Sequence, residues 1–385
     1  MLRKPMFQDV VHVGRPNIGD RAVLAKRIDD ALDRRWLTNG GPLLREFEER
    51  VAHIAGTEHC VATSNATNGL QIAAMALGLQ PGDQVIIPSF TWVATAHAMD
   101  WIGLVPVFCE VDEATGSADP AHVELLIGPR TKAILGVHVF GHPCLIEPLA
   151  KVAQRHAIPL LLDAAHAFGC TYQDKPIGGF GAAEVFSFHA TKYVNSFEGG
   201  AIVTNDPDLA ERARTMRTMG QDGTREVVGR GTVGRMSEVH AAMGLTSIEA
   251  MHDFIAINKR NDELYRTRLA PVPGVTVRPQ AAGEQANYQY LVIEVDESIA
   301  GVHRDDVHRI LHEHNVLSRK YFHPGCHEIE PYRSNPRRHA PLPLPRTEAL
   351  TQRVLALPTG TSIGQAEVDG ICEIIADAVA TARRG

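Results

Sequence analysis

Apolar residues recur at helical spacing in some parts of the chain and form short continuous runs in others. Leu24, Ile28 and Leu32 lie four residues apart, which predicts a helix from Asp20 to about Arg35. Strand–helix alternation follows, and it favours an α/β fold with a mainly parallel sheet covered on both faces. The pattern predicts strands at 84–87, 105–111, 133–139, 158–162, 185–188 and 202–204, and further helices at 43–54, 91–101, 119–128, 145–156 and 207–219.

The pattern changes from about Met251. A connecting helix is predicted over 253–269 and ends at the turn residues of 271–274. A strand at 290–295, a helix at 305–314, a short strand at 316–317 and a terminal helix follow. We therefore predict a large α/β domain, residues 1–250, and a smaller C-terminal α+β domain, residues 251–385. Residues 1–19 lack periodicity, and we expect them to lie across the surface or a neighbouring subunit.

Composition narrows the classes of function. The 385 residues carry a net charge of −7 without any basic block, which argues against a nucleic-acid partner. The six cysteines are far apart in apolar surroundings without a CxxC, so buried free thiols are expected rather than a metal or redox site. No apolar run approaches the length of a membrane span and no signal-peptide pattern is present, so we predict a cytoplasmic protein without a membrane partner.

Two stretches carry the candidate chemistry. Lys192 lies in a polar turn between two runs that predict buried strands, 185–188 and 199–204. A lone lysine is most often a solvated surface residue, but a desolvated one has a lowered pKa and attacks carbonyl groups. Asp163 ends another aliphatic strand, where a carboxylate needs a partner. Pyridoxal 5′-phosphate (PLP) enzymes need this pair, a lysine for the Schiff base and a carboxylate for the pyridine nitrogen.

The segment Ser64–Gly69, SNATNG, begins a predicted helix. Small polar residues there present free backbone N–H groups and the positive end of the helix dipole, which suits a phosphate. The simpler alternative is an N-cap with no ligand.

Several motifs together resemble the DegT/DnrJ/EryC1/StrS family of sugar aminotransferases of fold type I. The resemblance extends from about His12 to Ile375, and its most specific parts are DAAHAFG (163–169), SFHATK (187–192) and EGGAIVTND (198–206), with support from 235–245 and 319–332. It implies an aspartate-aminotransferase-like fold, with a large sheet domain and a small C-terminal domain. It also implies a homodimer with active sites at the interface.

The resemblance assigns further residues to the cofactor. Positions matching Ala66 and Thr67 bind the PLP phosphate, and Ser187 matches a phosphate-contacting serine. Trp92 matches an aromatic residue that covers one face of the ring, and His166 a residue that donates to the phenolic oxygen. The alternatives are a small strand residue for Ser187, a core side chain for Trp92 and a satisfied buried histidine for His166.

One position departs from the family pattern. Within Gly231–Ser237 the family commonly has an asparagine that reaches across the dimer to the phosphate, and this chain has Val233. Valine has no side-chain donor, so we expect weaker PLP retention or a substitute donor nearby.

The stretch 319–346 corresponds to a family loop that approaches the substrate, which makes Tyr321 and His323 candidate substrate contacts. His323, Cys326 and His327 lie close together, but they give no standard four-ligand set, so no metal is expected.

These residues predict a PLP-dependent aminotransferase (transaminase) with PLP held covalently on Lys192 and pyridoxamine phosphate as the aminated form. Lys192 and Asp163 are the predicted catalytic residues. The expected donor is L-glutamate or L-glutamine, and the expected acceptor is a keto-sugar such as a dTDP- or UDP-linked 4-keto-6-deoxyhexose. Three alternatives stay open: a PLP enzyme of another reaction class, an aminotransferase for a ketone without a nucleotide, and a non-catalytic regulatory protein.

Overall fold

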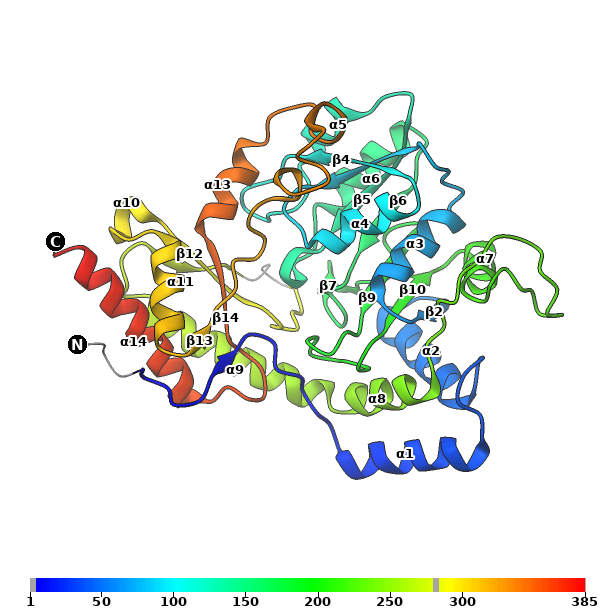
Figure 1. The fold of residues 1–385 in the computed structure, drawn as a ribbon, viewed down its shortest axis with the longest axis horizontal. Coiled ribbons are helices and arrows are strands. Elements are labelled where there is room, and N and C mark those ends of the chain that lie inside the picture. Colours follow the sequence, from blue (N-terminus) through cyan, green and yellow to red (C-terminus); the bar gives the residue numbers. More distant parts are fainter. Residues whose placement is uncertain (1–4, 280–283, 385) are drawn as a thin grey trace.

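A seven-stranded sheet forms the centre of the larger part of the molecule (Figure 1). The computed structural model describes residues 5–279 and 284–384. Strand β10 is antiparallel to both of its neighbours and the other six strands run in one direction, which confirms the predicted mainly parallel sheet. The order across the sheet is β2 (His59–Thr63), β10 (Gly200–Thr204), β9 (Ala183–Ser187), β6 (Leu160–Asp163), β5 (Thr131–Val137), β3 (Gln84–Pro88) and β4 (Val105–Cys109).

Helices cover both faces of this sheet. Alternate strand residues point to opposite sides, so each strand contributes side chains to both buried clusters. In β6, Leu160 and Leu162 belong to one buried cluster and Leu161 to the other. The first cluster includes residues of α2 (Pro42–Ala55), α5 (Pro120–Leu126), α6 (Ile146–Arg155) and α8 (Glu238–Glu249), and the second includes residues of α3 (Ala66–Ala76), α4 (Val93–Trp101) and α7 (Pro207–Arg217). Helix α1 (Arg21–Arg34) begins after the predicted Asp20, whose side chain caps it.

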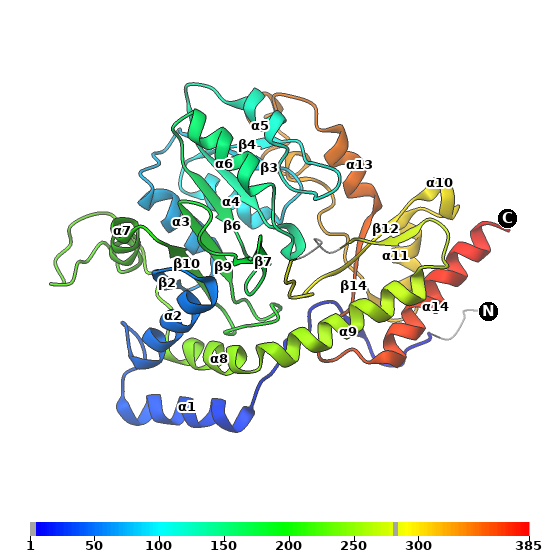
Figure 2. The same cartoon turned by 180° about the vertical axis from the view of Figure 1, so that it is seen from behind.

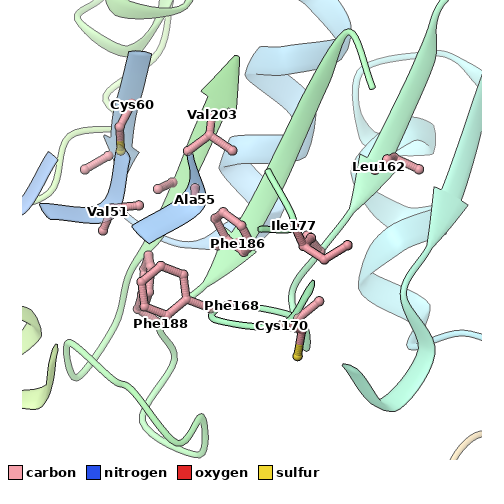
Figure 3. Close-up of a cluster of buried hydrophobic side chains, with 14 of the residues drawn as sticks. Val51, Ala55, Cys60, Leu162, Phe168, Cys170, Ile177, Phe186, Phe188 and Val203 are labelled. Atoms are coloured by element: carbon pink, nitrogen blue, oxygen red, sulfur yellow. The ribbon is translucent and has the colours of Figure 1, made fainter. Parts of the chain in front are cut away.

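Aromatic packing fixes the two segments that carry Asp163 and Lys192. Phe168 meets Phe186 and Phe188 edge-on at centroid distances of 5.2 and 5.1 Å. Phe188 in turn meets Phe47 of α2 at 5.2 Å. Figure 3 shows Phe168, Phe186 and Phe188 in the same cluster as Val51, Ala55 and Cys60. The turn after β6 and the end of β9 therefore share one rigid core.

The C-terminal part has its own antiparallel sheet in the order β11 (Val275–Val277), β12 (Leu291–Val295) and β14 (Val354–Leu357). Helices α9 (Met251–Leu269), α11 (Arg304–Glu313) and α14 (Gln365–Ala382) contribute to its buried cluster, and α8 and α9 run end to end along one side of the molecule (Figure 2). The smaller sheet has a buried cluster on one face, but Val292, Val354 and Ala356 on its other face belong to a cluster of the large sheet. The division at about residue 250 therefore stays a proposal. The remaining elements are β7 (Thr171–Tyr172), β8 (Lys175–Pro176), α10 (Glu297–Ala300), α12 (Pro336–His339), α13 (Pro345–Arg353) and two 3₁₀ turns, Val139–Gly141 and Cys326–Glu328.

The N-terminal segment joins this smaller part. Strand β1 (Val11–His12) pairs in parallel with β13 (Val316–Leu317). Asn17 is buried, and its side chain donates to Tyr193 O at 3.2 Å. Apart from Asn17, residues 5–19 are exposed or half-buried, so the described part of this segment lies on the surface, as predicted. A two-residue strand is too short to leave a period in the sequence.

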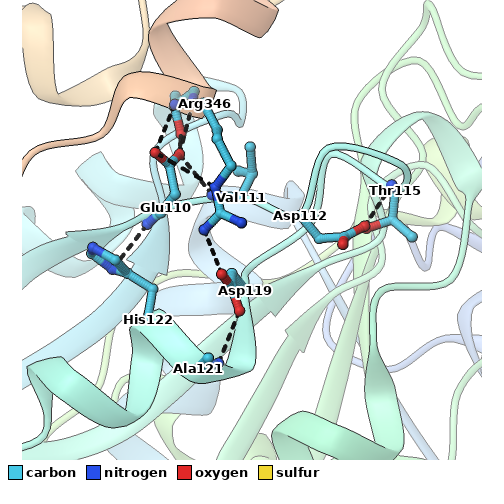
Figure 4. A network of polar contacts seen from close by, with 9 residues as sticks. Glu110, Val111, Asp112, Thr115, Asp119, Ala121, His122 and Arg346 are labelled. Atoms are coloured by element: carbon cyan, nitrogen blue, oxygen red, sulfur yellow. Dashed lines mark hydrogen bonds and ion pairs between the residues drawn. The ribbon is translucent and has the colours of Figure 1, made fainter.

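A buried carboxylate fastens the linker 319–346 to the large sheet (Figure 4). Glu110 follows β4 and is 2% exposed. It accepts hydrogen bonds from the backbone N–H groups of Arg346 at 2.8 Å and Thr347 at 2.7 Å. The Arg346 guanidinium also pairs with Asp119. These contacts fix one end of the linker that carries Tyr321.

Each of the six cysteines is buried with a free thiol, as predicted. Within residues 5–279 and 284–384, no helix combines the length and the apolar character needed to cross a bilayer.

Candidate functional site

A cavity of about 830 Å³ opens where the parallel strands β3, β5, β6 and β9 end. Ligands of α/β sheets bind at the carboxyl ends of the strands. Eight of the nine residues singled out in the sequence line this cavity: Ala66, Thr67, Trp92, Asp163, His166, Ser187, Lys192 and Tyr321. His323 lies outside its lining.

Lys192 lies in the turn between β9 and β10. Burial lowers the pKa of its amine to about 7, although the nearby negative charge of Asp163 opposes this shift. Its Nζ donates a hydrogen bond to Tyr290 Oη at 3.1 Å. At neutral pH a substantial fraction of the amine is therefore uncharged, as a nucleophile or general base requires.

Asp163 ends β6 and is 5% exposed. Its Oδ2 accepts from Thr95 Oγ1 at 2.8 Å, and its Oδ1 accepts from Ala165 N at 3.0 Å. Burial nevertheless raises the pKa of this carboxyl. A cationic partner inside the cavity would stabilise the charged form of this carboxylate, and a protonated ring nitrogen is such a partner.

His166 presents one defined tautomer. The backbone N–H of Phe140 donates to its Nδ1 at 3.2 Å, so the proton of the neutral ring belongs on Nε2. Burial and the Lys192 charge lower the pKa of this imidazole well below its usual value. The Nε2–H of His166 is thus available as a donor, as the family assignment requires.

The N-terminus of α3 is pressed against the sheet. Asn65 caps the helix, because its side chain accepts from Asn68 N at 2.8 Å. A Cβ on Gly200 would lie 2.5 Å from Ala66 N, so only glycine in β10 permits this approach. The first helical residues, Ala66 and Thr67, also line the cavity, where their N–H groups can bind an anion.

Trp92 is not a core residue, since it is 54% exposed at the N-cap of α4. Its ring meets that of Tyr321 edge-on at 5.9 Å, so the two aromatics lie on the same side of the cavity. Ser187 is the last residue of β9 and is 9% exposed. The phosphate role of Ser187 and the stacking role of Trp92 stay predictions.

The residues after Tyr321 attach its loop to the end of β3. Cys326 Sγ donates to Thr91 O at 3.4 Å, and His327 Nδ1 lies 2.7 Å from Ser89 Oγ. The backbone N–H of His323 donates to Lys320 O at 2.7 Å. The role of His323 in substrate binding stays a prediction.

Val233 lies on the segment after α7, which projects from the body in both views (Figures 1 and 2). Its side chain is 60% exposed, and those of Val227 and Val228 are 69% and 61% exposed. Exposed valines on a projecting segment, here among polar residues such as Arg225 and Glu226, are candidates for a surface that another molecule covers.

Sequence reasoning missed two residues of the site. Thr95 lies one turn beyond Trp92, and a threonine in an apolar helix was its only signal. Tyr290 comes from the smaller part of the molecule, and no local pattern connects it with Lys192.

The side chains fit PLP as a group. Lys192, with its lowered pKa, could bond to the aldehyde carbon, and Asp163 could pair with the ring nitrogen. The Nε2–H of His166 could donate to the phenolic oxygen, and the N-terminus of α3 could bind the phosphate.

Comparisons with known proteins agree with this arrangement. The model of the DegT/DnrJ/EryC1/StrS aminotransferase family matches residues 20–376. GDP-perosamine synthase of Caulobacter vibrioides is 35% identical over 364 residues, which cover 91% of this chain and 96% of that protein. The crystal structure of DesI in the presence of its TDP-sugar product superposes with a TM-score of 0.94 at 50% identity, over 99% of this chain and 97% of that one. DesV of S. venezuelae, in complex with a ketimine intermediate, gives a TM-score of 0.86 at 29% identity, over 95% and 98%.

Proposed function

Because the chain belongs to the DegT/DnrJ/EryC1/StrS aminotransferase family, we propose that this aminotransferase uses PLP to aminate a nucleotide-linked keto-sugar. The single observation that carries the cofactor assignment is Lys192, an amine of pKa about 7 on the same cavity as Asp163. When bound, PLP supplies an electrophilic carbon that carries the amino group and a ring that withdraws electrons.

Lys192 holds PLP covalently and later moves the proton. Once its Nζ is free, Lys192 would take the proton from the α-carbon of the donor as general base and return it, as general acid, to the C4′ carbon of the cofactor. The same steps in reverse aminate the ketone.

The other residues hold and orient the cofactor. Asp163, held by Thr95, stabilises the positive charge at the ring nitrogen, and the Nε2–H of His166 donates to the phenolic oxygen. Ala66 and Thr67, with Ser187, bind the phosphate, and Trp92 covers one face of the ring.

For the acceptor, we favour a 4-keto-6-deoxyhexose linked to dTDP or UDP. The support is the likeness to a GDP-perosamine synthase and to DesI with its TDP-sugar product. GDP-linked ketosugars therefore belong in the same screen. Tyr321, on the cavity, and His323, beside it in sequence, are the candidate contacts to this acceptor.

The protein acts as a homodimer in the cytoplasm, with L-glutamate or L-glutamine as donor. The exposed valines 227, 228 and 233 on the projecting segment support a second copy as the covering molecule. Val233 has no side-chain donor for the phosphate, so weaker PLP retention or a substitute donor nearby stays the expectation.

The decisive experiment is the visible spectrum of the purified protein before and after adding L-glutamate or L-glutamine. We expect the band of lysine-bound PLP to disappear as pyridoxamine phosphate forms. Each nucleotide ketosugar is then tested for its power to restore the band. A PLP band that ignores every amino donor would contradict aminotransfer, and a band restored only by ketones without a nucleotide would contradict the acceptor.

A further inference from the structure

Tyr290 immediately precedes β12, and its phenol reaches Lys192 from the smaller part of the molecule. Lys192 Nζ donates to Tyr290 Oη at 3.1 Å, and in the described part of the chain no other hydrogen-bond partner of Nζ occurs. The same nitrogen lies 5.5 Å from the centroid of the Tyr290 ring. The amine therefore lies at the hydroxyl edge of the ring, within hydrogen-bond distance of its oxygen.

The position of Tyr290 is fixed by contacts that do not depend on a substrate. Its ring centroid lies 4.5 Å from that of His166. Asn287 Nδ2 donates to His166 O at 2.8 Å, and Gln289 Oε1 accepts from the backbone N–H of Tyr193 at 3.1 Å. The segment that leads into β12 and carries Tyr290 is thus fastened to the turn after Asp163 and to the residue that follows Lys192.

We propose that Tyr290 is a positioning residue of the amino transfer, whose hydroxyl holds the Lys192 amine in place while that amine is not bonded to the cofactor. The inference rests on the function proposed above and deepens it. A hydroxyl accepts from the ammonium form of Nζ and donates to the lone pair of the neutral form. The amine therefore keeps one position in both protonation states, as a repeated proton transfer requires.

Proton bookkeeping leaves the phenol unchanged. Burial raises the pKa of Tyr290 above its usual value, so the phenol keeps its proton. The proton removed from the α-carbon of the donor resides on Lys192 Nζ until Nζ delivers it, and Tyr290 accepts a hydrogen bond from it in the interval. A hydrogen bond to a charged donor favours the charged form, so Tyr290 also supports the pKa of Lys192.

The test uses Tyr290→Phe, which keeps the ring against His166 and removes the oxygen. The full-length protein is loaded with pyridoxamine phosphate, which leaves Lys192 free, and is pulsed with an acetylating reagent across a pH series. Mass spectrometry of the Lys192 peptide then gives the midpoint of its reactivity. We expect the midpoint to fall by about one pH unit relative to the unsubstituted protein.

Kinetics supply the second readout. We expect kcat to fall about tenfold in Tyr290→Phe with the KM for the amino donor unchanged. Tyr172→Phe is the matched control, because Tyr172 lies in β7 outside the cavity and packs edge-on against Phe180 at 5.4 Å. Tyr290→His, which restores a hydrogen-bonding atom on a ring, is expected to recover part of the loss.

Two results would overturn the inference: an unchanged midpoint with an unchanged kcat, or a change confined to KM, which would make Tyr290 a substrate contact. Acetylation is measured without any sugar, so it separates this inference from the proposed acceptor. If the midpoint shifts while no nucleotide ketosugar is aminated, Tyr290 keeps its role and the acceptor proposal fails.

Discussion

Thr95→Val tests whether Asp163 is tuned by its neighbours. Thr95 Oγ1 donates to Asp163 Oδ2 at 2.8 Å, and it lies 2.9 Å from Thr91 Oγ1. Because Thr95 uses its proton on the carboxylate, Thr91 must be the donor in the second contact. A short chain of hydroxyls thus ends on Asp163, and valine removes its last member without changing the shape of the side chain.

The magnitude follows from the charge on the acceptor. A hydrogen bond to a charged group contributes about 1.5–3 kcal/mol, and one pKa unit corresponds to about 1.4 kcal/mol. Removing the Thr95 hydroxyl should therefore raise the pKa of Asp163, already raised by burial, by about one to two further units. A carboxylate with a higher pKa is protonated at higher pH, so activity should be lost earlier as the pH falls.

The assay is the pH dependence of kcat, together with the rate of the donor half-reaction followed at the PLP band. We expect the acid limb to move upward by about one to two units and the loss to be smallest at alkaline pH. Thr351→Val is the control, since Thr351 is fully buried and donates to Glu348 O at 2.8 Å in a helix remote from the cavity. An acid limb that stays in place or moves downward would refute the reasoning.

Three further predictions concern the lysine, the sheet and the linker. Lys192→Met should abolish turnover and raise the unfolding free energy of the cofactor-free protein by about 2–4 kcal/mol near pH 6. The pKa of Lys192 is about 7 in the folded protein and 10.5 for an ordinary lysine, so the lysine destabilises the fold only at pH values where it is charged in the unfolded chain. The gain in stability should therefore vanish by about pH 11. Equal differences in urea midpoint between variant and unsubstituted protein at the two pH values would contradict this. Gly200→Ala should weaken PLP binding at least tenfold by displacing Ala66, which equilibrium titration measures, and unaltered affinity would show that the α3 N-terminus does not bind the phosphate. Glu110→Gln should lower the unfolding free energy by about 1–3 kcal/mol in thermal unfolding, because it replaces the charged acceptor of the Thr347 N–H by a neutral one. A fall in kcat with unchanged thermal stability would instead place the linker in the catalytic step.

Local pattern was sufficient where one element decided the outcome. Leu24, Ile28 and Leu32 predicted α1, and the aliphatic run before Asp163 predicted β6. Lys192 and Asp163 were found in the same way, since each follows a predicted strand. The other predicted cavity residues were assigned through the family resemblance. The single antiparallel strand β10 was not distinguishable, because strand direction depends on pairing and leaves no mark on the run itself.

Contacts between distant parts of the chain could not be predicted. Nothing around Tyr290 points to a lysine 98 residues earlier, and nothing around Thr95 points to a carboxylate 68 residues later. Trp92 shows that local pattern can also mislead. An aromatic residue at the start of a helix is usually a core residue, yet the Trp92 side chain is 54% exposed. Burial is a property of the assembled fold, and a sequence window contains only part of it.

The pairing of β1 with β13 has a consequence for synthesis on the ribosome. Val11 pairs with Val316, so the first strand of the chain must wait while 305 further residues are made. At about 5–20 residues per second this delay is roughly 15–60 s. During that time the large sheet can assemble, and Asn17, which is buried against Tyr193, can hold the nascent segment near its destination. The order of folding therefore differs from the order of translation at the N-terminus, because β1 is the first strand to be made and one of the last to pair.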